Sequence, residues 1–418
     1  MRGRWSRGVP TRLFMRRIIM HIDVNNAFLS WTAVLYLKQG NKVDIRKTYA
    51  VIGGDEKARH GIVLAKSMPA KKRGVVTAET LYSAKKKCPN LKVYPPNYIF
   101  YKKMSDSMLS LIRNYSPDIE QMSIDECFLD YTPVKHLYGD EVEFAYRLKK
   151  EIYDTLGFTV NVGIGNNKLC AKMASDFSKP YKVHTLFEEE VEKKMWPLQV
   201  DELFGIGKKT AIKLHNLNIN TIYDLAHTDR EFLYKYFKNQ AQDMIDSANG
   251  RGSDIVVSEE SIPKGIGNET TLNRNISSRE ELYPYLLALS ENVAIRLRKQ
   301  NKYASVIVVT LKDKFFKRMS HQKKLVNATN LTEEIYKTAC DILDEMNVDD
   351  GIRLIGVRLD KLSDTSSHQV SLFEDLKVRE DNNELEKTVD ELKEKYGFKV
   401  IKKASLIDSK VGNKYLNK

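Results

Sequence analysis

The sequence predicts a chain of the α+β class that folds into several domains. Short apolar runs that end in carboxylates alternate with segments of helical periodicity over residues 15–175. A mostly helical stretch follows over residues 176–248, and a second set of strands and helices follows over residues 258–362. At 418 residues the chain is long enough for several domains of ordinary size.

Two apolar segments carry acidic residues. The segment 18–23 ends at Asp23, and the segment 121–130 contains Asp125 and Glu126. Ionised carboxylates in apolar surroundings cost free energy unless something pairs with them. Mg²⁺ takes oxygen ligands and often shares them with substrate phosphates. Brought together, the three acids would therefore form a site for two-metal phosphoryl chemistry.

An adjacent Asp and Glu are also typical of a solvated loop or a strand end. Successive side chains of a regular strand point to opposite faces. Asp125 and Glu126 can therefore serve one metal cluster only at a turn or at the end of a strand, and periodicity alone leaves both interpretations open.

Four motifs in this order resemble those of the Y-family (translesion) DNA polymerases, most closely the bacterial members, over nearly the whole chain. They are HIDVNNAF at 21–28, SIDE at 123–126, TVNVGIGNNK at 159–168 and LFGIGKKTA at 203–211. The resemblance implies a right-hand polymerase with a palm, fingers, a helical thumb that contains a helix-hairpin-helix, and a little finger. It also implies a DNA-templated polymerase that extends primers past damaged bases with low fidelity.

The same resemblance, with the pattern of elements, suggests the domain boundaries. We expect a disordered extension at 1–14, a palm at 15–26 and 97–175, fingers at 27–96, a thumb at 176–248, a flexible linker at 249–257, a little finger at 258–362 and a tail at 363–418. Within these, the sequence predicts helices over 101–115, 141–156 and 383–396, and strands around 160–164, 304–311 and 353–359.

In such a polymerase Asp23, Asp125 and Glu126 would be the catalytic carboxylates. Together with the backbone carbonyl of Val24, they would hold two Mg²⁺ ions. Phe28 stands where the family places a ring that excludes a 2′-hydroxyl, although without the motif it would be an ordinary core residue.

Two lysines match family residues that neutralise the triphosphate of the deoxynucleotide, Lys71 and Lys168. Two positions depart from the usual pattern. Met68 stands where many relatives have a tyrosine, so a hydroxyl contact to a phosphate is missing there. Asn25 stands where many relatives have an acid that is not a required ligand.

A formal net charge of +13 favours a polyanionic partner such as primer–template DNA, although many basic proteins bind no nucleic acid. A helix-hairpin-helix is matched at Gly205, Gly207 and Lys208, and its tight turn would present N–H groups to a phosphate. The alternative is that these residues belong to an ordinary helical packing unit. A basic segment between two predicted strands suits phosphate contacts or a solvated hairpin tip. Its lysines are Lys312, Lys314 and Lys317.

The tail carries Gln369, Leu372 and Phe373, a pattern that resembles the peptide by which bacterial polymerases bind the sliding clamp. The alternative is that Leu372 and Phe373 pack back on this chain. A charged amphipathic helix is predicted after it, with Leu385, Val389 and Leu392 on one face.

The four cysteines form no C-x-x-C pair and suit buried thiols in a reducing compartment. With no apolar run long enough for a membrane span, we expect a monomer in the bacterial cytoplasm, near the nucleoid. Two alternatives remain at this stage: another palm-type two-metal enzyme such as a nucleotide cyclase, and a non-catalytic DNA-bound scaffold of the same fold.

Overall fold

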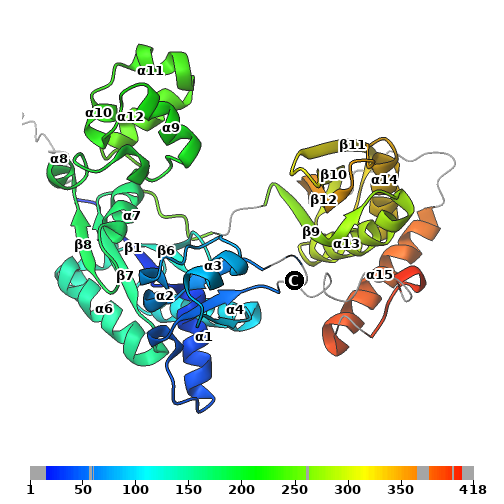
Figure 1. Cartoon of the computed structure of the whole chain (residues 1–418), viewed down its shortest axis with the longest axis horizontal. Helices are drawn as coiled ribbons and strands as arrows, with labels where there is room; N and C mark the ends of the chain where they lie inside the picture. The colour runs from blue at the N-terminus through cyan, green and yellow to red at the C-terminus, as the bar shows by residue number, and fades with distance from the viewer. Residues whose placement is uncertain are drawn as a thin grey trace, which may run out of the picture. The chain divides into compact units, whose positions relative to one another are not determined.

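The computed structural model describes residues 16–55, 59, 61–259, 263–364, 376–397 and 400–406. The chain forms two compact units (Figure 1), the first from residues 1–54 and 62–260 and the second from residues 55–61 and 261–418. The predicted disordered extension at 1–14 lies outside the described residues.

The main sheet of the first unit has the order β5-β6-β1-β7-β8. Its central strand, β1, pairs antiparallel with both neighbours, while β7 and β8 are parallel. Its strands are β1 (Ile19–Val24), β5 (Ile119–Gln121), β6 (Glu126–Asp130), β7 (Val160–Gly165) and β8 (Val183–Leu186).

Helices cover both faces of this sheet. Met20 and Ile22 of β1 point into a core that they share with three helices, while Ile19 packs against Ala171 on the opposite face. This alternation follows from the two-residue period of a strand. The three helices of the core are α1 (Ala27–Lys38), α4 (Tyr98–Arg113) and α6 (Glu141–Leu156), and the helix on the other face is α7 (Lys168–Asp176).

A smaller sheet with the order β3-β2-β4 lies within the block expected to form the fingers. Val51 and Val63 of this sheet share a separate apolar cluster with Leu81. Its elements are β2 (Ala50–Gly53), β3 (Val63–Lys66), α2 (Met68–Lys72), α3 (Leu81–Lys87) and β4 (Lys92–Tyr94).

The segment expected to be mostly helical, residues 176–248, first adds β8 to the main sheet and is mostly helical after it. The apolar cluster of these helices also includes Leu169 and Met173 of α7 and Leu186 of β8. The helices are α8 (Val191–Lys194), α9 (Lys208–Asn216), α10 (Ile222–Ala226), α11 (Arg230–Phe237) and α12 (Gln240–Ala248), and a one-turn helix, α5 (Lys135–Tyr138), precedes α6 in the main layer.

The segment 249–257, expected to be a flexible break, is hydrogen-bonded to the main layer. Asn167 Nδ2 donates to the carbonyl of Gly250 at 2.8 Å, and the N–H of Lys168 donates to the carbonyl of Ser253 at 2.9 Å. The N–H of Val257 donates to Glu120 at 2.9 Å. Because these partners are distant in sequence, the Gly and Ser content of the segment could not reveal them.

The second unit contains an antiparallel sheet with the order β11-β10-β12-β9. Two helices share its apolar core, which includes Leu289, Ile307 and Ile342. The elements are β9 (Gly265–Ile276), α13 (Arg279–Lys299), β10 (Tyr303–Asp313), β11 (Arg318–Thr329), α14 (Thr332–Asp344) and β12 (Ile352–Ser363). The strands expected at 304–311 and 353–359 are confirmed and are longer than predicted.

A last helix, α15 (Leu376–Tyr396), docks on α13 through charged side chains. Leu385 and Leu392 are exposed, whereas Lys393 is buried against Glu291. The guanidinium of Arg298 binds the carboxylate of Asp390 with two contacts, at 2.7 and 2.9 Å. The buried guanidinium of Arg298 thus selects carboxylates of α15, a contact that the apolar spacing of this helix did not predict.

Cys88, Cys127 and Cys170 are buried free thiols, as expected, and Cys340 is half-buried. Across the described ranges, every helix is too short or too polar to cross a lipid bilayer.

Candidate active site

Three acidic residues stand where β1 ends and β6 begins. Asp23 lies near the end of β1, directly opposite Glu126, the first residue of β6. Asp125 stands in the turn just before β6, and its carbonyl accepts a hydrogen bond from the N–H of Val24 at 3.0 Å. The turn position that a shared site requires of Asp125 and Glu126 is thus confirmed.

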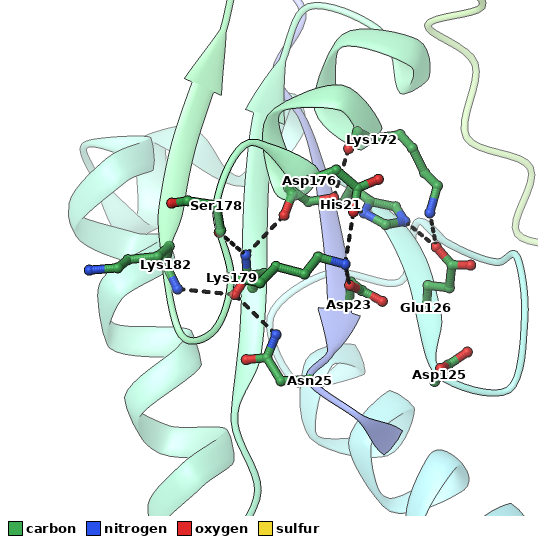
Figure 2. A network of polar contacts seen from close by, with 12 residues as sticks. His21, Asp23, Asn25, Asp125, Glu126, Lys172, Asp176, Ser178, Lys179 and Lys182 are labelled. Carbon is green, nitrogen blue, oxygen red and sulfur yellow. Dashed lines mark hydrogen bonds and ion pairs between the residues drawn. The ribbon is translucent and has the colours of Figure 1, made fainter. Parts of the chain in front are cut away.

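Glu126 is held from two sides (Figure 2). His21 shares a face of β1 with Asp23, and its Nε2 lies 2.9 Å from Oε2 of Glu126, while its Nδ1 lies 2.8 Å from Oγ of Ser175. The ammonium group of Lys172 binds the same carboxylate. The hydrogen bond with His21 and the contact with Lys172 outweigh burial and lower the pKa of Glu126 to about 2. This carboxylate is therefore ionised at neutral pH.

Asp23 is neutralised by Lys179, which stands on the loop after α7 (Figure 2). Burial raises the pKa of Asp23, and the ammonium of Lys179 opposes that shift. Burial alone would lower the pKa of Lys179, but the carboxylates of Asp23 and Asp176 raise it overall. Lys179 thus remains charged beside the acids.

A cavity of about 480 Å³ opens beside these acids. Acidic, aromatic and basic side chains from separate segments line it, among them Asp23, Asp125, Phe28, Arg46, Lys71 and Lys179. A cavity lined by both acidic and basic side chains suits a ligand that carries both phosphates and metal ions.

Phe28 lines this cavity from the first turn of α1 and is half-buried. Its ring stacks on Tyr101, with centroids 4.6 Å apart and planes 9° apart, and meets the edge of Tyr98 at 6.0 Å. These neighbours hold the ring in one orientation, so one part of it packs and another part faces the cavity.

Lys168 lies away from this cavity, contrary to its expected role. Its Nζ binds the carboxylate of Glu120 at 2.8 Å, and it is absent from the lining to which Lys71 belongs. Lys179, which sequence reasoning missed, occupies the place beside Asp23. Sequence spacing shows a run of lysines from 168 to 179 but does not show which of them faces the acids.

Two asparagines fix the loop that carries Lys179. Asn25 Oδ1 accepts from the N–H of Tyr181 at 2.9 Å, and Asn161 Nδ2 donates to the carbonyl of Ser178 at 2.7 Å. The two asparagine side chains also bond to each other at 3.1 Å. Asn25 therefore positions this loop through its oxygen. Its amide group donates to Asn161 Oδ1, a bond that a carboxylate at that position could not make.

Met68 also lines the cavity and is 43% exposed, at the start of the helix that bears Lys71. The Ser67 hydroxyl caps this helix by accepting from the N–H of Ala70.

The glycines of the predicted helix-hairpin-helix present open backbone. Gly205 has a φ of +95°, which favours glycine, and Gly207 immediately precedes α9, which begins at Lys208. A Cβ at either glycine would meet no atom within 4 Å. Both glycines are exposed, so a ligand can approach the backbone of this turn closely.

The remaining predicted binding residues lie in the second unit or beyond the described part. Lys312, Lys314 and Lys317 surround the turn between β10 and β11. Gln369, Leu372 and Phe373, expected to bind a sliding clamp, lie outside the described residues.

Comparisons with protein families match three parts of the chain. Residues 22–176 match the impB/mucB/samB family, residues 188–219 match the HHH motif of the IMS family, and residues 263–372 match the C-terminal domain of the impB/mucB/samB family. The first match contains all three acidic residues.

Similar proteins extend over nearly the whole chain. A protein named DNA polymerase IV from Clostridium acetobutylicum is 48% identical over 396 residues, which are 94% of this chain and 99% of that one. DNA polymerase IV from Clostridium kluyveri is 33% identical, over 94% of this chain and 99% of its own. Among solved structures, a Y-family DNA polymerase chimera of Dbh and Dpo4 matches with a TM-score of 0.73 and 27% identity, over 82% of this chain and 98% of that one.

Proposed function

Because this chain belongs to the impB/mucB/samB family of Y-family polymerases and is a DNA-directed DNA polymerase, we propose that it extends primers past damaged template bases with low fidelity. The observation that carries the proposal is that Asp23, Asp125 and Glu126 stand at the adjoining ends of β1 and β6, beside a cavity lined by Phe28 and basic residues. Membership of this family sets aside the nucleotide cyclase. The intact set of acids argues against a non-catalytic scaffold.

The proposed chemistry needs two Mg²⁺ ions, which Asp23, Asp125, Glu126 and the carbonyl of Val24 would hold. Within the described residues, no three His, Cys, Asp or Glu side chains converge closely enough to hold an ion. The donor set nevertheless fits, since it consists of hard oxygen ligands and Glu126 is ionised. Lys172 and Lys179 neutralise two of these carboxylates.

When bound, such ions lower the pKa of the primer hydroxyl and stabilise the charge that grows on the attacking and leaving oxygens. The residues of this chain supply the rest. His21 and Lys172 orient the carboxylate of Glu126, and the half-buried ring of Phe28 excludes a 2′-hydroxyl from the sugar position.

Lys71 and Lys179 are the proposed contacts to the triphosphate. Both line the cavity, and Lys179 stands beside Asp23 on a loop that the asparagines anchor. A lysine serves there as a point charge with three donors. Lys168, the first residue of α7, pairs with Glu120 and is not proposed to contact the triphosphate.

DNA is proposed to contact the open backbone at Gly205 and Gly207, with Lys208, and the lysines of the β10–β11 turn. N–H groups and lysines are suited to phosphates, which position a duplex without reading its sequence. The tail motif at Gln369, Leu372 and Phe373 is proposed to bind the sliding clamp. A cytoplasmic, monomeric enzyme fits these partners.

The test is primer extension on two templates that differ only in one damaged base. With Mg²⁺ and all four deoxynucleotides, the protein should insert opposite the lesion and continue, and it should misinsert often on the undamaged template. Extension that stops at every lesion tried, with accurate copying elsewhere, would contradict lesion bypass and low fidelity while leaving the polymerase activity standing.

A further inference from the structure

The turn between β10 and β11 exposes two adjacent aromatic rings. Phe315 is 70% exposed and Phe316 is 63% exposed, more than any other phenylalanine in the part of the chain that the structure describes. Two large apolar side chains kept in water at the end of a hairpin call for an explanation, because each would be stabilised by burial.

This turn is held firmly. The carboxylate of Asp313, only 3% exposed, accepts hydrogen bonds from the N–H groups of Phe315 at 2.8 Å and Lys317 at 2.9 Å. The N–H of Phe316 donates to the carbonyl of Asp313 at 3.1 Å, and the N–H of Lys314 donates to the carbonyl of Gly351 at 2.9 Å. The rings are thus displayed by an ordered backbone.

The turn itself does not require an aromatic residue. Phe316 has a φ of +68°, a conformation that bulky residues rarely adopt and that glycine or asparagine would adopt with less strain. A phenylalanine at this position therefore suits a function of the side chain better than it suits the turn.

Cations flank both rings. Lys314 Nζ lies 4.9 Å from the centre of the Phe315 ring. Two cations lie near the centre of the Phe316 ring: Lys312 Nζ at 5.8 Å and the guanidinium of Arg353 at 4.9 Å. None of these three cations has a carboxylate partner among the described residues. The surface thus combines aromatic faces with positive charge that is not paired with any carboxylate of the described residues.

We propose that this tip, Phe315 and Phe316 with their flanking cations, is a stacking site for unpaired bases of single-stranded DNA. Every base has a face that can stack on an aromatic ring, and the cations would contact the phosphates on either side. Bases of a duplex stack on one another, so their faces are not available. The inference rests on the proposed function, because the unpaired bases are those of the template strand.

The experiment measures the affinity of the full-length protein for labelled oligothymidine and for a blunt duplex. Phe315→Ala with Phe316→Ala should weaken oligothymidine binding by roughly five- to a hundredfold and leave duplex binding within about twofold. Tyr396→Ala is the matched control, because Tyr396 is also exposed beside a lysine, Lys395, at 5.3 Å, but lies on α15. This control should bind both DNAs as wild type does.

Two single variants keep the test decisive if the double variant does not fold. Phe315→Trp should retain the affinity and lose tryptophan emission when oligothymidine is added, whereas Phe315→Leu should lose affinity although it stays apolar. Equal losses for both DNAs would assign the rings to a duplex groove. Unchanged binding by every variant would disprove the stacking site, and the exposed rings would then suit a contact with another protein.

Salt dependence separates the two components of the tip. Lys312→Ala with Lys314→Ala should reduce the slope of log affinity against log salt, while the phenylalanine variants should lower affinity at an unchanged slope. Oligothymidine binding does not require nucleotide transfer. A protein that binds it through Phe315 but extends no primer would therefore disprove the proposed function and not this site.

Discussion

At the scale of single residues, the site depends on which basic side chain pairs with each acidic residue. Glu126 is ionised because His21 and Lys172 stabilise its carboxylate, and Asp23 is buried beside Lys179. A cation introduced here meets acids that lysines already neutralise, so binding of metal ions has to rearrange these pairs. This coupling explains why lysines, and not only acids, determine the site.

Phe28→Ala should raise the ratio of ribonucleotide to deoxyribonucleotide insertion by roughly tenfold or more, since it removes the ring proposed to clash with a 2′-hydroxyl. Deoxyribonucleotide insertion should persist. The measurement is single-nucleotide insertion of each substrate by both proteins. An unchanged ratio would return Phe28 to a packing role against Tyr101.

Lys179→Ala should weaken the apparent affinity for the incoming deoxynucleotide by roughly tenfold or more, because a charged hydrogen-bond partner of the triphosphate is lost. Lys168→Ala is the matched control and should change this nucleotide affinity little, since Lys168 binds Glu120 away from the cavity. Single-turnover insertion at varied nucleotide concentration gives both values. A larger effect at Lys168 would restore the role first expected of it.

At the scale of elements, the sequence predicted those helices and strands whose boundaries are set by interactions between residues close in sequence. The helix expected over 141–156 is α6 (Glu141–Leu156), because Asp140 caps its first turn and Gly157, with a φ of +82°, ends it. The motif strands were likewise predictable, whereas periodicity left open whether Asp125 stands in a turn. The docking of α15 and the orientation of Lys179 were not, because both depend on partners distant in sequence.

The charged attachment of α15 is testable. Glu386→Gln with Asp390→Asn should lower the free energy needed to open α15 by about 3 kcal/mol, because Arg298, whose side chain is 5% exposed, loses its carboxylates. Hydrogen exchange of the α15 amides in the full-length protein measures this change.

The matched control for α15 is Glu394→Gln on the same helix. Glu394 pairs with Lys299 at 3.0 Å, but both side chains are largely exposed, so the change should stay below about 1 kcal/mol. Equal exchange in the double variant and this control would show that apolar contacts, and not the buried ion pairs, hold α15.

At the scale of the whole molecule, the proposed chemical centre lies in one unit, and the residues proposed to contact DNA are divided between both units. The motifs of the chain left open whether it is more similar to polymerase IV or to the catalytic subunit of polymerase V, and both Clostridium relatives named above are called DNA polymerase IV. The charge of +13 is consistent with DNA binding at several surfaces.

Leu372→Ala with Phe373→Ala should abolish stimulation of synthesis by a loaded sliding clamp and leave clamp-independent insertion intact. A short peptide binds modestly, but tethering to a ring on DNA raises the effective concentration of the enzyme at the primer end. Primer extension with and without clamp compares the two proteins. Equal stimulation of both would exclude these residues as the clamp contact.

The central claim is that Asp23, Asp125 and Glu126 form the chemical centre of this polymerase. The most direct measurement is the rate of a single deoxynucleotide insertion by Asp125→Asn, with primer–template affinity determined on the same preparation. The rate should fall by roughly 10²- to 10³-fold or more, while DNA affinity and the rate of an Asp154→Asn surface control stay near wild type. Insertion by Asp125→Asn at close to the wild-type rate would contradict the assignment.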